Sequence, residues 1–177
     1  DTANPKAMEA GLKKSTNKPI INSITNEDSN EEIRQLASQY GTDVIGLAMG
    51  QQGMPQDVDE RISETEYLIE RCEKLGIDRE NLYIDPIAMS VGSSPKQGKY
   101  VLEAVRKIKE KFTLKTSLGL SNVSFGLPDR SLLNSVFLAM LLEAGLDAAL
   151  MDPTEKDMIE TLKASECLLA DDRMCIQ

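Results

Sequence analysis

The stretch from Thr116 to Ser124 reads TSLGLSNVS and combines an apolar run with a polar end. Its first part, Thr116–Leu120, is a short apolar run that is typical of a parallel strand covered on both faces. The polar residues Ser121, Asn122 and Ser124 follow directly. This order places hydrogen-bonding side chains at the carboxyl end of a strand, where parallel α/β folds bind their ligands.

Short apolar runs of the same kind recur along the chain. They are Pro19–Ser23, Asp43–Ala48, Leu82–Asp85 and Ala148–Met151. Helical stripes lie between them, and one steps by 4, 3, 4 and 3 residues through Val58, Ile62, Thr65, Ile69 and Cys72. Strand–helix units of about 35 residues have the size of βαβ units and predict an α/β fold. This pattern alone leaves both a doubly wound sheet and a (β/α)8 barrel open.

Helix boundaries are marked by capping residues, proline and glycine. Asn4-Pro5, Ser94-Pro95 and Asp152-Pro153 each join a capping side chain to a proline, which predicts a helix start. Gly11, Gly76 and Gly145 each precede an apolar residue and predict helix ends. Asp152 is therefore interpreted as a helix cap.

Composition excludes several classes of function. The chain has 177 residues, with 20 Lys plus Arg against 29 Asp plus Glu, and a net charge of −9. This charge argues against a nucleic-acid partner and against a basic membrane-binding surface. The longest apolar run, Val136–Leu142, is too short to span a bilayer. Cys72, Cys167 and Cys175 form no CxxC motif, which favours a reduced, cytoplasmic location.

The chain contains no histidine, so a Ser-His-Asp triad, a Cys-His pair and a histidine metal site are excluded. No GxGxxG motif follows a strand, and no GxxxxGK[ST] motif is present, which argues against dinucleotide and P-loop sites. The polar residues at the predicted strand ends are Asn22, Asp85 and Asn122, together with Asp1 and Asp152. Carboxylates and amides in this arrangement suit a flat nitrogen heterocycle, such as a pterin or a purine, better than a phosphate.

Five segments in register resemble the pterin-binding methyltransferase family. They are Asp1–Ala7 (DTANPKA), Pro19–Ser23 (PIINS), Leu82–Pro86 (LYIDP), Leu118–Ser124 (LGLSNVS) and Ala144–Asp152 (AGLDAALMD). Members of this family include methyltetrahydrofolate:corrinoid/iron–sulfur protein methyltransferase and the folate domain of cobalamin-dependent methionine synthase. The resemblance implies a (β/α)8 barrel of which residues 1–177 form the C-terminal five strand–helix units, as one partial domain. It also implies that three N-terminal strands lie in a removed segment or in another chain, and that the protein is a homodimer.

The resemblance implies roles for single residues and an activity. Asp1, Asn22 and Asp85 would hold the pterin ring, with Ser121 as a further substrate contact whose alternative role is backbone capping. Asn122 would lie nearest the reaction, close to N5 of the pterin. The activity would be transfer of the N5 methyl group of methyltetrahydrofolate, or a related tetrahydropterin, to the cobalt of a corrinoid carried by a partner protein, with no metal bound by this chain. The alternatives are a dihydropteroate synthase-like enzyme and a non-catalytic folate-binding subunit.

Overall fold

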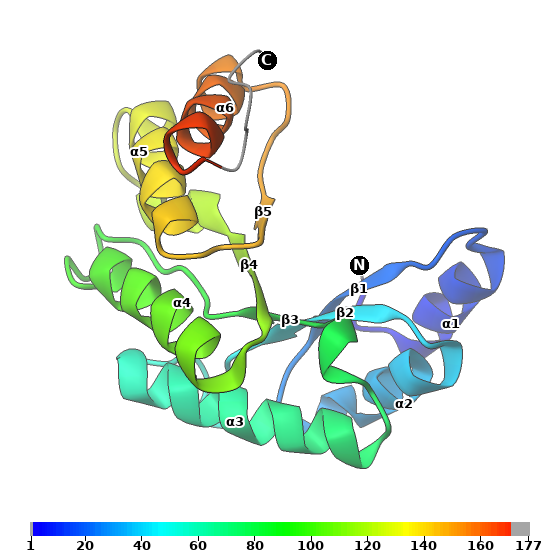
Figure 1. The fold of residues 1–177 in the computed structure, drawn as a ribbon. Helices are drawn as coiled ribbons and strands as arrows, with labels where there is room; N and C mark the ends of the chain where they lie inside the picture. The colour runs from blue at the N-terminus through cyan, green and yellow to red at the C-terminus, as the bar shows by residue number, and fades with distance from the viewer. Residues whose placement is uncertain (1, 171–177) are drawn as a thin grey trace.

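The computed structural model describes residues 2–170, which form alternating strands and helices (Figure 1). The strands are β1 (Ile20–Ile24), β2 (Asp43–Leu47), β3 (Leu82–Asp85), β4 (Lys115–Gly119) and β5 (Ala148–Leu150). The helices are α1 (Pro5–Lys14), α2 (Glu31–Tyr40), α3 (Val58–Lys74), α4 (Gln97–Phe112), α5 (Arg130–Glu143) and α6 (Lys156–Leu168). Short 3-10 helices cover Asp28–Asn30 (η1), Arg79–Asn81 (η2) and Leu120–Ser124 (η3).

The order of the strands decides between the two architectures that the sequence leaves open. All neighbouring strands are parallel, and they lie side by side in the order β1-β2-β3-β4-β5. A doubly wound sheet reverses its strand order at a switch point, whereas a barrel adds each strand beside the last. The sheet also curls, with the helices around its outer side (Figure 1). The predicted α/β class is confirmed, and the arrangement is that of consecutive units of a (β/α)8 barrel.

Alternation along each strand separates two faces of this curled sheet. Ile21, Val44, Ile84 and Leu118 are buried in clusters with apolar residues of the helices, so they point outward. The residues between them point to the concave side. Two apolar side chains on that side, Ile20 and Leu150 in the edge strands, remain 54% and 40% exposed.

The predicted strands are confirmed to within one residue at each end, whereas the predicted caps are confirmed only in part. Asn4 caps α1 by accepting hydrogen bonds from the backbone of Lys6 and Ala7. Gly76 and Gly145 follow their helices with φ of 76° and 96°, as the sequence predicts. The helix end predicted at Gly11 is wrong, because α1 continues through it to Lys14.

Two predicted helix starts are wrong. α4 begins at Gln97 rather than at Pro95, because the carbonyl of Ser94 accepts the Gln97 N–H in a preceding turn. Asp152 does not cap α6, which begins at Lys156. Its carboxylate instead accepts hydrogen bonds from the backbone N–H and hydroxyl of Thr154, closing a local turn.

Candidate functional site

The carboxyl ends of β3 and β4 are joined by the carboxylate of Asp85. Asp85 is the last residue of β3 and is 8% exposed. Its Oδ1 accepts the Ile87 N–H at 2.7 Å, and its Oδ2 accepts the Gly119 N–H at 3.2 Å, across the strand pair. The carboxylate is therefore fixed in direction by one hydrogen bond within its own loop and by one to the neighbouring strand.

Burial raises the pKa of the Asp85 carboxyl from 3.8 to about 6. The hydrogen bonds from Ile87 and Gly119 act in the opposite direction but do not offset the loss of hydration. Asp85 makes no ion pair with any Lys or Arg side chain of residues 2–170. A buried carboxyl group without a cationic partner gains from a ligand that presents N–H donors to it.

Asn122 lies beside the same strand end. It belongs to η3, directly after β4, and its side chain is exposed. Its Nδ2 is 3.9 Å from the point that a Cβ atom on Gly119 would occupy. Both residues thus lie against Gly119. Asp85 accepts its N–H, and the Asn122 amide lies beside the space that a side chain at this position would fill. The sequence interpretation did not assign Gly119 to the site, although a glycine ending a buried strand is a signal of close approach.

The 3-10 helix that carries Asn122 is held by Arg130, which the sequence interpretation also missed. The Arg130 guanidinium donates to the hydroxyl of Ser124 at 3.0 Å and to the carbonyl of Ser121 at 2.9 Å. The Ser124 hydroxyl in turn donates to Oδ1 of the buried Asn134 at 2.7 Å. An arginine at the first position of a helix is opposed by the helix dipole, and this is the signal in the sequence that points to another role.

The other predicted site residues are Asn22, Ser121 and Asp1, and the structure does not place them all beside Asp85 and Asn122. Asn22 is half-buried on β1, opposite Ile45 of β2, and alternation places it on the concave face. It lies two strands from Asp85. Ser121 is exposed and lines a cavity of about 550 Å³ on the far side of β4, together with Arg130 and Asn134. Asp1 lies outside the described residues.

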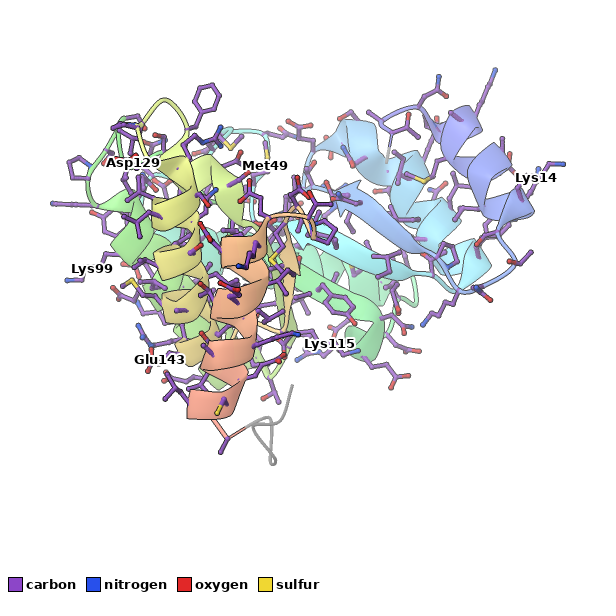
Figure 2. The ribbon with its side chains drawn as sticks, turned by 90° about the horizontal axis from the view of Figure 1, so that it is seen from above. Lys14, Met49, Lys99, Lys115, Asp129 and Glu143 are labelled. Carbon is purple, nitrogen blue, oxygen red and sulfur yellow. The ribbon has the colours of Figure 1, made fainter. Side chains whose placement is uncertain are left out.

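The two ends of the strands differ in character. Figure 2 shows Met49, just after β2, and Lys115, at the start of β4, at opposite ends of the sheet. At the amino end, Nζ of Lys115 lies 4.9 Å from the centre of the Tyr83 ring and donates to the carbonyl of Glu80. The pair of Asp85 and Asn122 lies at the other end. Residues 2–170 hold no group of three His, Cys, Asp or Glu side chains arranged for a metal ion. None of their helices has the length and apolarity that crossing a bilayer requires.

These features define a class of protein. Parallel strands in sequential order, with polar side chains gathered at their carboxyl ends, are typical of α/β-barrel proteins that bind their ligand at this rim. The family model described as "Pterin binding enzyme" matches residues 1–152. The chain belongs to this family, and the resemblance that the sequence motifs indicate is confirmed.

Two curated relatives are similar over most of the chain. Methylcorrinoid:tetrahydrofolate methyltransferase of Eubacterium limosum is 27% identical over 181 residues, which cover 99% of this chain and 66% of the relative. Methionine synthase of Mycobacterium leprae is 32% identical over 165 residues, which cover 85% of this chain and 14% of the relative. The chain therefore spans just under two thirds of the first relative and a small part of the second.

Solved structures of dihydropteroate synthases share the fold. The enzyme of Yersinia pestis gives a TM-score of 0.71 at 17% sequence identity, covering 96% of this chain and 71% of the other. The enzyme of Clostridium difficile gives a TM-score of 0.73 at 18% identity, covering 95% of this chain and 65% of the other. At such low identity the likeness establishes the fold and not the activity.

Proposed function

We propose that this chain carries the tetrahydropterin site of a methyltransferase, which moves the N5 methyl group of methyltetrahydrofolate to the cobalt of a corrinoid held by a partner protein. The observation that carries this proposal is the meeting of Asp85 and Asn122 at Gly119. Membership of the pterin-binding family and the names of the two curated relatives support the choice of ligand and of reaction.

Asp85 is proposed to bind the N–H edge of the pterin ring. A carboxylate accepts two parallel hydrogen bonds from such an edge, and the low hydration of Asp85 strengthens them. Asn22 is proposed to meet the ring from β1, and Ser121 to contact the substrate beside β4. Asp1 is proposed to complete the set. Together these contacts would fix the ring so that the methyl group faces the partner's corrinoid.

Asn122 is proposed to donate an amide N–H to N5 of the pterin. As the bond between N5 and the methyl carbon breaks, its electron pair stays on N5, and a hydrogen bond to N5 strengthens as that charge develops. The corrinoid supplies the cobalt nucleophile that takes the methyl group. The same contacts serve the reverse transfer, because both directions pass through one transition state.

The change Asn122→Ala tests this role. Loss of one aimed donor is expected to lower the single-turnover rate of methyl transfer by about 10²-fold. The rate is followed by the absorbance of the Co(I) corrinoid, and the affinity for methyltetrahydrofolate, measured by calorimetry, should fall much less. Asn17→Ala is the control, since Asn17 is an exposed asparagine in the α1–β1 loop at the other end of β1. An unchanged rate in Asn122→Ala removes this residue from the mechanism.

Two alternative functions give different results in the same assays. A dihydropteroate synthase-like enzyme would condense a pterin with an aminobenzoate and leave the corrinoid spectrum unchanged. A non-catalytic folate-binding subunit would bind methyltetrahydrofolate without any turnover. Only the shared fold of the solved structures supports the first alternative, so methyl transfer remains the proposed activity.

The proposal extends to the architecture and the setting of the protein. We propose that residues 1–177 are five units of a barrel that three further strand–helix units complete, from the same or another chain. The exposed, inward-facing Ile20 and Leu150 support this, because further strands would cover them. A homodimer and a cytoplasmic location are also proposed. The location is supported by Cys72 and Cys167, which form no disulfide within the described residues 2–170.

A further inference from the structure

A completely buried arginine lies behind the candidate site. Arg61 of α3 has no exposed surface. Its Nε donates to the carbonyl of Pro86 at 2.8 Å, and its Nη2 donates to the carbonyl of Ile87 at 3.2 Å. The remaining bonds go to the carbonyl of Asp57 and to Oε1 of Gln97, both at 2.8 Å. Every acceptor is neutral, and Arg61 makes no ion pair within residues 2–170.

The loop that Arg61 holds contains an unfavourable backbone conformation. Ile87 has a φ of +64°, in the left-handed region that β-branched residues avoid. Its carbonyl is held by Arg61 on one side, and its N–H donates to Oδ1 of Asp85 on the other. The same residue therefore links the buried guanidinium to the carboxylate that faces Gly119.

We propose that Arg61 is a positioning residue for the tetrahydropterin site, which holds the Asp85-Pro86-Ile87 turn so that the Asp85 carboxylate keeps its direction. This inference rests on the proposed function. A positioning role, and not a ligand contact, is assigned because the Arg61 side chain is completely buried and its guanidinium already donates four hydrogen bonds to loop and helix groups.

The chemistry of the guanidinium explains why arginine stands here. Its planar fork offers five donors in fixed directions, so that one side chain meets acceptors at the residue before α3, on the turn after β3 and on α4 together. An ammonium group on a flexible stem cannot meet all of them. Burial lowers the pKa of Arg61, and the charges of Asp57 and Glu60 act in the opposite direction without offsetting the loss of hydration.

The test is the change Arg61→Lys, with Arg34→Lys as the matched control. Arg34 is also fully buried and also holds loop carbonyls, but it does so in the loop after β1. Both changes keep the charge and are expected to destabilise the fold. Only Arg61→Lys should release Ile87, which removes a hydrogen bond that lowers the pKa of Asp85. Two results are expected in Arg61→Lys alone: a carboxyl titration of Asp85, followed by carbon NMR, that moves to higher pH, and a tenfold or greater loss of methyltetrahydrofolate affinity.

The titration is measured without ligand, so it separates two kinds of failure. If the wild-type protein does not bind methyltetrahydrofolate, the proposed function fails, while the Asp85 titration still tests the role of Arg61. If Arg61→Lys leaves the titration and the affinity unchanged, or if Arg34→Lys moves the titration equally, the positioning role is wrong. Should Arg61→Lys not fold, Gln97→Ala removes one of its partners. A smaller shift in the same direction supports the role, and no shift overturns it.

Discussion

The loops after β1 and β3 are both held by an arginine, but only the arginine at the first loop forms an ion pair with a carboxylate. Each is held by a fully buried arginine that donates to loop carbonyls. Arg34 donates to the carbonyls of Thr25 and Glu27, and it also pairs with the carboxylate of Glu31 at 2.7 Å. Arg61, in contrast, meets only neutral acceptors. The carboxylate of Glu31 therefore balances the charge of Arg34, whereas Arg61 forms no ion pair within residues 2–170.

The polar side chains of the two loops follow the same division. In the loop after β1, the Asn26 side-chain amide donates to both the carbonyl and the carboxylate of Glu64, and the backbone carbonyl of Asn26 accepts a hydrogen bond from Arg71 at 2.7 Å. In the loop after β3, Asp85 binds backbone N–H groups only. Protein groups thus engage the Asn26 amide nitrogen and the charged side chains at the first loop, whereas Oδ1 of Asn26 is buried without a partner among residues 2–170. The second keeps a carboxylate with spare acceptor capacity at the rim, which is what a ligand site requires.

The largest expected effect is the pH dependence of stability that Asp85 causes. Its pKa is about 6 in the folded protein, against an ordinary value of 3.8, so folding favours the protonated form. The stability it contributes is complete below pH 3.8 and is lost as the pH rises through 6. The loss amounts to about 3 kcal/mol. Asp85→Asn should lack this loss, which urea unfolding at pH 4 and pH 8 would measure.

The loop after β1 provides the control of opposite sign. Hydrogen bonds from Arg34 and Arg71 hold the pKa of Glu31 below its ordinary value. Glu31 therefore stabilises the fold above pH 4.5, and this contribution is lost as the pH falls. Glu31→Gln should reduce the loss of unfolding free energy as the pH falls below 4.5. This change should be smaller than the one that Asp85→Asn causes near pH 6, because Glu31 is partly exposed. Parallel curves for wild type and Asp85→Asn would contradict the assignment of an uncompensated carboxyl.

A second effect separates the two asparagines that follow strands. Asn26 is 2% exposed and is bonded to Glu64, whereas Asn122 is exposed. Asn26→Ala is expected to lower the free energy of unfolding by about 1–3 kcal/mol, because Glu64 and buried backbone lose their partner. It should leave methyltetrahydrofolate affinity within about twofold. Asn122→Ala should do the reverse, with stability unchanged and transfer slowed. Equal destabilisation by both changes would remove the contrast between the loops.

The sequence predicts the strands, and with them the strand-end positions, because a buried parallel strand must be a short apolar run. It cannot separate Asn26 from Asn122. Both are polar residues after a strand, and the difference arises from Glu64, which is distant in sequence and contributes its backbone and side chain only in the folded state.

The role of Arg61 is hidden for a related reason. The predicted stripe on α3 is confirmed, since Val58, Thr65, Ile69 and Cys72 are buried and Ile62 is partly buried. The buried face is wider than predicted, however, because it also includes Arg61 and Leu68. Arg61 follows Val58 by three residues and precedes Thr65 by four, the spacing of a buried face. A charged residue at such a spacing indicates a buried side chain that binds other protein groups. The sequence does not identify these groups, because the carbonyls of Pro86 and Ile87 come from another loop.

The smallest expected effect concerns Ser121, on the β4 side of the comparison. Its hydroxyl lines the cavity beside Arg130 and makes no hydrogen bond within residues 2–170, whereas its carbonyl holds η3 in place. Ser121→Ala should therefore change the free energy of unfolding by less than about 0.5 kcal/mol. If the hydroxyl contacts the substrate, affinity for methyltetrahydrofolate falls by about fivefold, the value of one hydrogen bond of about 1 kcal/mol. Ser63→Ala, on the exposed side of α3, is the control. Unchanged affinity in Ser121→Ala, beside a clear loss in Asp85→Asn, would confine the ligand to the β3 side of Gly119. The Asp85 carboxylate would then have to bind the substrate without any contact from the cavity that Ser121 lines.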